Sequence, residues 1–240
     1  MAITPRPMID QGKMDENTRL KLHAARHALA LVEPGMTLGL GSGSTATLWI
    51  QLLGERVRDH GLRIRAIASS EESERLARSY GIPFVTLEEC HSLDLTVDGA
   101  DEIAPGLALI KGGGGKLLRE KIVAIASRRF VIVADESKEV EKLGRFPLPV
   151  EIIPMAAPLV VESLRELGFI PKVRLNKDTT PYITDEGNLI LDCSGLLIEE
   201  PALMARSLDS IVGVVEHGLF LGMANLAIIA GKNKLRERSS

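Results

Sequence analysis

Two neighbouring runs decide how this chain folds: VDGADEI at residues 97–103 and LIKGGGGKLLREKIVAIA at residues 109–126. The first run closes an apolar segment, LDLTVD at 93–98, which has the composition of a buried strand. In the second run, four glycines precede apolar residues at helical spacing between 116 and 127. A strand, a polar turn, a glycine loop and a helix in this order predict an α/β domain, in which ligands bind outside the carboxyl ends of the strands.

The alternation of strands and helices continues on both sides of these runs. Apolar segments at 37–41, 64–69 and 130–135 predict further strands, and helices are predicted at 46–58 and 71–79. Short apolar strands that alternate with helices favour a parallel sheet, so we expect a Rossmann-like parallel-sheet domain. Both ends of the chain, residues 1–12 and 232–240, are expected to be loosely held.

The pattern changes near Gly144, where prolines begin to punctuate the chain. Downstream we expect a strand at 150–153, a helix at 157–167, a strand at 171–175, a hairpin at 182–192, a helix at 201–211 and a strand at 214–220. This β-α-β-β-α-β order is typical of a ferredoxin-like α+β domain. An apolar run at 226–231 resembles the earlier strands. We therefore expect a Rossmann-like domain at 1–143 and 221–240, with a ferredoxin-like domain inserted at 144–220.

Composition excludes several classes of protein. The 240 residues are 45% apolar and 25% charged, so an ordinary buried core is expected. Only 3% are aromatic and the net charge is -3, which disfavours a nucleic-acid partner. Two cysteines are too few for a disulfide framework, and no apolar run has the length of a membrane span or the features of a signal peptide. We therefore expect a cytoplasmic protein that binds neither nucleic acid nor membrane.

Asp98 and Asp101 stand at the carboxyl end of a predicted strand, where open α/β sheets bind ligands. The pair could act as a general acid and base, or accept hydrogen bonds from sugar hydroxyls. A solvated turn is the structural alternative, since Asp and Gly are common in turns. Carboxylates alone could also hold magnesium or calcium, but no histidine or cysteine lies nearby, and we expect no metal.

Two glycine-containing turns are candidate sites for an anion. GSGST at 41–45 joins a predicted strand to a helix, whose free N–H groups and partial positive charge attract anions. The alternative is a tight turn in which a hydroxyl residue caps the helix. KGGGGK at 111–116 is not a nucleotide P-loop, because Ile110 and Leu117 replace the glycine and the hydroxyl residue that this motif requires.

Residue type alone does not single out Glu120 or Lys138. A glutamate in the first turn of a helix is usually a surface residue, and Arg119 and Lys121 offer it exposed partners. The residue types give no reason to prefer Glu120 over Glu102. Lys138 follows a strand at the ligand edge of the sheet, where it could contact a substrate or face solvent.

Five motifs occur together in this chain: GSGSTA, VDGADEI, IKGGGGKLLREKI, ADESK and LGRFPLPVEIIP. In this order and spacing they resemble the type A ribose-5-phosphate isomerases over nearly the whole chain, and the pairing of DGADEI with KGGG and REKI is highly specific. The resemblance implies an aldose-ketose isomerase that interconverts ribose 5-phosphate and ribulose 5-phosphate by general-base proton transfer through an enediolate. It also implies a homodimer that uses no metal and no organic cofactor.

The resemblance implies roles for the matched residues. Glu120 corresponds to the proton acceptor, and Asp98 and Asp101 correspond to acids that bind the sugar and open its ring. Lys111 belongs to the loop that faces the reacting end of the substrate, where it is a candidate to stabilise the enediolate. Substrate contacts are expected at Ser42, Gly43, Ser44, Thr45, Asp98, Gly99, Ala100, Asp101, Lys111, Gly112, Gly113, Gly114 and Lys138.

The chain departs from the family pattern inside the glycine loop. Family members have a shorter glycine run followed by small residues and a threonine, whereas this chain has Gly115, Lys116 and Leu118 at those places. Lys116 therefore adds a positive charge near the predicted site.

The main alternative is a non-catalytic sugar-phosphate sensor of related fold. Such a sensor usually carries a DNA-binding helix pair, whereas residues 1–36 offer one helix, and it has no use for Glu120. Amino-sugar-phosphate deaminases and coenzyme A transferases of related fold are disfavoured by the pairing of DGAD with KGGG.

Overall fold

The computed structural model describes residues 14–232 and 234–239, so the predicted arm at 1–12 lies outside the described residues. By its internal contacts the chain divides into two compact units. The first unit comprises the residues up to Gly99, 126–137 and 226–238, and the second comprises 100–125 and 138–225. Among the described residues, no helix is both long enough and apolar enough to cross a membrane.

The described residues of the first unit centre on a six-stranded sheet. Its strands are β1 (Thr37–Leu40), β2 (Arg65–Ala68), β3 (Leu95–Asp98), β6 (Phe130–Asp135), β12 (Leu226–Ala230) and β13 (Leu235–Ser239), in the order β13-β12-β6-β3-β1-β2. The pairs β2–β1, β1–β3, β3–β6 and β6–β12 are parallel, which confirms the predicted Rossmann-like sheet. Because β2 and β3 lie on opposite sides of β1, the strand order reverses between β1 and β3. Ligands bind at the carboxyl ends of the strands at such a reversal.

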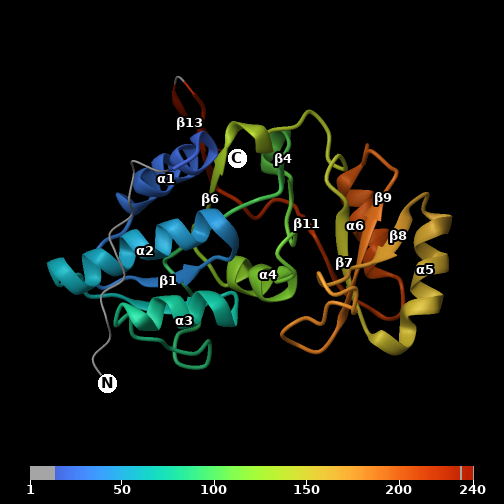
Figure 1. Ribbon diagram of the computed structural model, residues 1–240, viewed down its shortest axis with the longest axis horizontal. Coiled ribbons are helices and arrows are strands. Elements are labelled where there is room, and N and C mark those ends of the chain that lie inside the picture. The colour runs from blue at the N-terminus through green and yellow to red at the C-terminus, as the bar shows by residue number, and fades with distance from the viewer. Residues whose placement is uncertain (1–13, 233, 240) are drawn as a thin grey trace. The chain divides into compact units, whose positions relative to one another are not determined.

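Helices α1 (Glu16–Leu29), α2 (Gly43–His60) and α3 (Glu71–Ser79) pack on this sheet, and α2 lies between the other two (Figure 1). Local signals fix their ends. The Asp15 carboxylate accepts the Thr18 N–H at 2.8 Å before α1, and Gly61 takes a left-handed conformation after α2. The buried stripe of α2, which includes Trp49 and Leu53, belongs to the core of this unit.

The second unit contains an antiparallel sheet of β7 (Leu148–Ile152), β8 (Ile170–Val173), β9 (Leu189–Ser194) and β10 (Val214–His217), in the order β10-β7-β9-β8. Helix α5 (Ala157–Glu166) follows β7, and helix α6 (Pro201–Asp209) follows β9. This β-α-β-β-α-β succession confirms the predicted ferredoxin-like α+β fold. Val150, Leu164 and Leu191 lie in its core.

A smaller sheet of the second unit carries the glycine loop. It consists of β4 (Glu102–Ile103), β5 (Leu109–Ile110) and β11 (Leu219–Phe220) in the order β11-β5-β4, and helix α4 (Leu117–Ile125) follows the loop. Short 3-10 helices elsewhere in the chain are η2 (Pro105–Leu107), η3 (Glu136–Lys138) and η4 (Pro154–Ala156).

The strand expected at 214–220 is divided at Gly218 into β10 and β11. The Gly218 N–H donates to the Pro149 carbonyl at 2.8 Å, and the Gly218 carbonyl accepts the Lys111 N–H at 2.9 Å. The chain therefore passes from one sheet to the other within a single residue. A Cβ at position 218 would lie 2.4 Å from the Lys111 carbonyl oxygen, so this step requires glycine.

The prediction of a frayed carboxyl terminus is wrong, because residues 235–239 form the edge strand β13. Leu235 packs against the core of the first unit, and the Glu237 carboxylate lies 2.6 Å from His27 Nε2. These contacts hold a segment whose composition is mostly polar.

The two compact units also divide the chain differently from the predicted domains. Residues 100–125 pack with the second unit, because β4 and β5 form a sheet with β11 and because α4 contacts β7 and β10. The assignment of 1–143 and 221–240 to one domain and 144–220 to another stays a proposal.

Glu151, the residue before the last in β7, carries a buried carboxyl group, and it is 1% exposed. Its Oε1 accepts hydrogen bonds from Thr184 Oγ1 at 2.8 Å and from Asn188 Nδ2 at 3.0 Å. Burial raises the pKa of Glu151; these two hydrogen bonds oppose the shift, and the charges of Glu186 and Glu216 add to it.

We expect Glu151→Gln to gain stability over the wild type as the pH rises from 4 to 7. Above the ordinary pKa of 4.5, the unfolded wild-type chain loses a proton that the folded protein keeps, so wild-type stability falls through this window. Gln keeps the oxygen acceptor and does not titrate. Urea unfolding of both proteins at the two pH values measures the difference, and a difference that does not grow with pH would contradict this account.

Candidate active site

The carboxylate of Asp98 ties β3 to the turn that follows β1. Its Oδ1 accepts the Ser42 N–H at 2.9 Å and the Gly99 N–H at 2.7 Å, and the residue is 1% exposed. β1 and β3 are the neighbours between which the strand order reverses. The predicted substrate turn and one of the predicted acids are therefore in contact at the ligand edge of the sheet.

Gly41 is required for this contact. A Cβ at position 41 would lie 2.2 Å from Asp98 Oδ1 and 2.6 Å from Asp98 Cα, far inside van der Waals distance. Gly43 begins α2 with a φ of +85°, a conformation that residues with a side chain rarely adopt. The close approach and the positive φ explain why the turn carries glycine at both positions.

The same turn gathers hydroxyl groups and one ammonium group. Ser42 Oγ lies 2.8 Å from Ser69 Oγ, and Ser44 Oγ accepts a hydrogen bond from Lys21 Nζ at 3.0 Å. Ser44 is exposed, whereas Thr45 is buried in the first turn of α2. A cation beside a helix N-terminus favours the binding of an anion. Sequence reasoning missed Lys21, because this residue lies on α1, 23 positions before Ser44, and belongs to no motif.

In the second unit, Asp101 holds the glycine loop. Its Oδ2 accepts the Gly113 N–H at 2.7 Å, and its own N–H donates to the Ile110 carbonyl at 2.8 Å. A Cβ on Gly113 would lie 2.6 Å from Asp101 Oδ1, so the approach of loop and carboxylate depends on glycine. Gly112 is buried, and Gly114 is exposed.

Lys111 and Glu120 form a buried ion pair across the glycine loop. Lys111 Nζ lies 3.5 Å from Glu120 Oε2, and the two side chains are 2% and 5% exposed. The Lys111 ammonium also lies 5.5 Å from the centroid of the Phe220 ring. A carboxylate and an ammonium group held together away from bulk water are suited to moving a proton and to stabilising the negative charge that results.

The interpretation of Glu120 as a surface residue is wrong, and its neighbours on α4 pair elsewhere. Arg119 Nε donates to Glu186 Oε1 at 2.5 Å, and Lys121 Nζ donates to Glu216 Oε1. Burial lowers the pKa of Lys121, and the charge of Glu216 opposes this shift. Successive residues of α4 therefore face different partners.

Glu102 and Glu120, which residue type did not separate, have different surroundings. Glu102 is 2% exposed, and its two carboxylate oxygens accept the N–H groups of Gly144 at 2.7 Å and Phe146 at 2.5 Å. Both oxygens are thus committed to the backbone of the segment that leads into β7. Glu102 is a structural clamp, whereas Glu120 faces a lysine.

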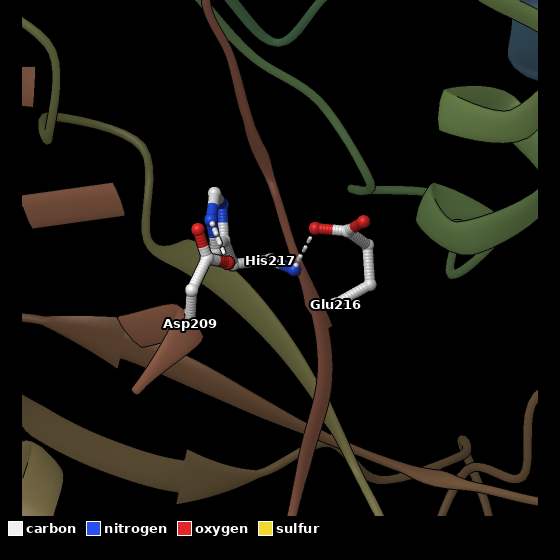
Figure 2. Close-up of side chains that lie close together, drawn as sticks. All are labelled: Asp209, Glu216 and His217. Atoms are coloured by element: carbon white, nitrogen blue, oxygen red, sulfur yellow. Dashed lines mark hydrogen bonds and ion pairs between the residues drawn. The ribbon is translucent and has the colours of Figure 1, made fainter. Parts of the chain in front are cut away.

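Asp209, Glu216 and His217 are the one group of potential metal ligands found in the described part of the chain, with ligand atoms within 4.8 Å of one another (Figure 2). The Glu216 carboxylate accepts a hydrogen bond from the Lys121 ammonium group. His217 Nδ1 accepts the Leu219 N–H at 3.2 Å, and His217 Nε2 lies 3.1 Å from Asp209 Oδ1. With Nδ1 as acceptor, the neutral ring carries its proton on Nε2 and donates it to Asp209. Burial and the Lys121 charge lower the pKa of His217, which favours this neutral form. The arrangement favours a hydrogen-bonded network over a metal site.

Lys138 ends η3 directly after β6 and is half-buried. Asp135 shapes this segment, because its Oδ1 accepts the Ser137 N–H at 3.0 Å. Gly99 and Ala100 are half-buried and connect β3 to Asp101.

Within each unit, the structure brings several of the predicted residues into contact. In the first unit, the Ser42–Thr45 turn meets Asp98. In the second unit, Asp101 meets Gly113, and Lys111 meets Glu120.

Comparison with known proteins gives a consistent result. The sequence profile of the family described as ribose 5-phosphate isomerase A (phosphoriboisomerase A) matches residues 65–234. A relative named ribose-5-phosphate isomerase A, from Roseiflexus sp. (strain RS-1), is 51% identical over 226 residues, which are 93% of this chain and 97% of the relative.

Solved structures agree with the sequence relatives. The ribose 5-phosphate isomerase A of Methanocaldococcus jannaschii is 42% identical with a TM-score of 0.89, over 92% of this chain and 99% of that one. A D-ribose-5-phosphate isomerase in complex with phospho-erythronic acid is 34% identical with a TM-score of 0.91, over 95% of this chain and 100% of that one.

We expect Glu102→Gln to lower the free energy of unfolding by about 1–3 kcal/mol, because the amide NH2 group would face a backbone N–H of a half-buried residue, Gly144 or Phe146, that now has a carboxylate acceptor. Urea unfolding measures the loss. Glu199→Gln is the matched control, since Glu199 is an exposed partner of Lys142 and its replacement should change stability by less than about 0.5 kcal/mol. Equal stabilities of the two variants would remove Glu102 from its role as a clamp.

Proposed function

Because this chain belongs to the ribose 5-phosphate isomerase A family, we propose that it interconverts ribose 5-phosphate and ribulose 5-phosphate by proton transfer. The observation that carries the proposal is the buried Lys111–Glu120 pair, in which a cation that precedes the glycine loop meets a carboxylate of the helix that follows it. An aldose-ketose isomerase needs a base that reaches the carbon next to a carbonyl group, and a positive or hydrogen-bonding partner for the oxygen that becomes negative.

Ring opening comes first in the proposed mechanism, because a cyclic sugar has no carbonyl group to activate. Asp98 takes the proton of the anomeric hydroxyl, the bond between C1 and the ring oxygen breaks, and Asp98 gives the proton to the ring oxygen. An aldehyde at C1 results. The burial of Asp98 and its contact with the Ser42 turn support this role. Asp101 accepts hydrogen bonds from sugar hydroxyls.

Isomerisation follows at C2. Glu120 removes the C2 proton, the electron pair of the C2–H bond forms a C1=C2 double bond, and negative charge develops on the C1 oxygen. The same group returns the proton to C1, and the proton of the C2 hydroxyl moves to the C1 oxygen, which gives the ketose. A base positioned in this way contributes about 10²–10⁴-fold in rate.

The enediolate needs donors where its charge develops. Lys111 and the backbone N–H groups of Gly112–Gly114 are the proposed donors, and the loss of one such donor costs roughly 10²–10³-fold in kcat. No step of this mechanism calls for a metal ion or an organic cofactor.

The phosphate group is assigned to the turn at the start of α2. Free N–H groups of the helix N-terminus, the hydroxyls of Ser42–Thr45 and the Lys21 ammonium supply hydrogen bonds and positive charge. Gly43 adds a backbone without a side chain, so an anion can approach it closely. Lys138 is proposed as a further substrate contact.

A non-catalytic sugar-phosphate sensor is not favoured, because the matching family and the relatives are named as isomerases. We keep the homodimer and the cytoplasmic location as parts of the proposal. Both cysteines of the chain, Cys90 and Cys193, are free, which suits a reducing compartment.

Glu120→Gln should lower kcat by at least about 10²–10⁴-fold, because the amide cannot accept the C2 proton. Formation of ribulose 5-phosphate gives the rate, and binding of phospho-erythronic acid tests whether the substrate site is intact. Glu102→Gln supplies the same acid-to-amide change at the structural clamp and should act on stability instead. Isomerase activity near the wild-type level in Glu120→Gln would remove Glu120 from the role of base.

Lys21→Met should raise the KM for ribose 5-phosphate by about 10- to 100-fold, because a charge-assisted hydrogen bond contributes roughly 1.5–3 kcal/mol. Competitive inhibition by inorganic phosphate should weaken in parallel, whereas kcat should change much less. Lys142→Met, at an exposed lysine paired with Glu199, is the control. Unchanged KM and unchanged phosphate inhibition in Lys21→Met would place the phosphate elsewhere.

A further inference from the structure

The glycine loop contains a β-turn whose central peptide has two possible orientations. The turn spans Gly112–Gly115 and is closed by the Gly115 N–H, which donates to the Gly112 carbonyl at 2.9 Å. Types I and II of such a turn keep this hydrogen bond and differ by a flip of the peptide between the two central residues. Both central residues, Gly113 and Gly114, are glycine, so side chains do not choose between the two types.

Arg174 contacts this turn from the segment after β8. Its Nε donates to Asp192 Oδ2 at 2.9 Å and its Nη2 donates to Asp192 Oδ1, which fixes the plane of the guanidinium group. The remaining nitrogen, Nη1, lies 2.9 Å from the Gly112 carbonyl oxygen and 3.2 Å from the Gly113 carbonyl oxygen. One nitrogen atom therefore binds two successive carbonyl groups of the loop.

These contacts determine where the loop's N–H groups point. In a trans peptide the C=O and N–H bonds point in opposite directions. The carbonyls of Gly112 and Gly113 both face Arg174, so the N–H groups of Gly113 and Gly114 both point away from it. The Gly113 N–H donates to the Asp101 carboxylate at 2.7 Å, so the side of the loop opposite Arg174 is the side that faces Asp101. Gly114 lacks the positive φ that a type II turn requires at its third residue.

We propose that Arg174 is a positioning residue of the isomerase reaction: it holds the central peptide of the glycine turn in one orientation, so that the Gly114 N–H is presented on the side of Asp101 as a donor to the substrate's developing enediolate oxygen. This inference rests on the proposed function. Arg174 acts through the loop and touches no substrate. When its contact is lost, the peptide flips in part of the molecules and presents a carbonyl where the donor is needed.

Arginine is the side chain that this arrangement requires. A planar guanidinium group can bind both oxygens of Asp192 with two nitrogens and still offer a third to the loop. A lysine ammonium is a compact point charge, so it cannot hold Asp192 in a bidentate manner and both carbonyls in fixed positions. Arg174→Lys should therefore lower kcat in the same way as Arg174→Ala, although by less, and should not behave as a conservative replacement.

The first test compares Arg174→Ala and Arg174→Lys with the wild type for isomerisation of ribose 5-phosphate. We expect kcat to fall by about 10- to 100-fold in Arg174→Ala, as for partial loss of an oxyanion donor, with a much smaller change in KM. Affinity for phospho-erythronic acid, whose carboxylate oxygens mimic those of the enediolate, should fall as well. Inhibition by inorganic phosphate should stay as in the wild type. Arg165→Ala, at an exposed arginine of α5 paired with Glu162, is the matched control.

The second test asks whether peptide orientation is the cause. An alanine at position 114 disfavours the flipped turn, because a side chain makes positive φ costly, and a Cβ there meets no atom within 4 Å. The fold-loss in kcat caused by Arg174→Ala should therefore be smaller when it is measured in the Gly114→Ala background. A purely structural role of Arg174 predicts the same fold-loss in both backgrounds.

The inference is overturned if Arg174→Ala has wild-type kcat, if KM and phosphate inhibition change as much as kcat, or if the Gly114→Ala background leaves the loss unchanged. A wild-type protein that does not isomerise ribose 5-phosphate would instead overturn the proposed function. The two failures are thus distinguished by the wild-type measurement alone.

Discussion

Three carboxylates within one five-residue run hold three separate segments of the chain by accepting hydrogen bonds from backbone N–H groups. In DGADE, residues 98–102, Asp98 holds the turn after β1, Asp101 holds the glycine loop, and Glu102 holds the segment before β7. A backbone N–H that folding removes from water must find an acceptor, and an ionised carboxylate is a strong one. Each acid therefore fixes the path of a different segment of the chain.

Helix α4 adds a second constraint, because its neighbouring side chains point in different directions around the helix. Glu120 faces Lys111 and Lys121 faces Glu216, both in buried surroundings. Removing one member of a buried ion pair leaves an uncompensated charge, so each pair restricts how the helix can rotate or slide. Lys116 and Arg119 reach Asp185 and Glu186 on the turn before β9. Lys116, which departs from the family pattern, thus links the end of the glycine loop to the turn before β9 through its ion pair with Asp185.

Much of the fold follows from local pattern. The strand at 130–135 and the helix at 71–79 were predicted with the bounds that the structure has, since an apolar run and a capped amphipathic segment carry their signals within themselves. The predictions failed where contacts between residues far apart in the sequence determine the local structure. The predicted strand is divided at Gly218, because the Gly218 N–H bonds to a residue of β7 and the Gly218 carbonyl bonds to Lys111, which follows β5. Strand β13 forms because Leu235 and Glu237 contact residues of the first unit. No window of neighbouring residues contains that information.

The candidate site divides in the same way. The positions of the acids, the glycines and the strand ends along the chain could be predicted from the sequence, because residue type and periodicity are local properties. Folding brought Glu102 to backbone N–H groups and Glu120 to a lysine. It also brought Lys21 to Ser44, and Arg174 to two carbonyl groups of the glycine turn. These last two contacts span 23 and 62 residues. The physical reason is that the chemistry of a carboxylate or an ammonium group depends on its burial and its partner, and chain folding alone brings such partners together.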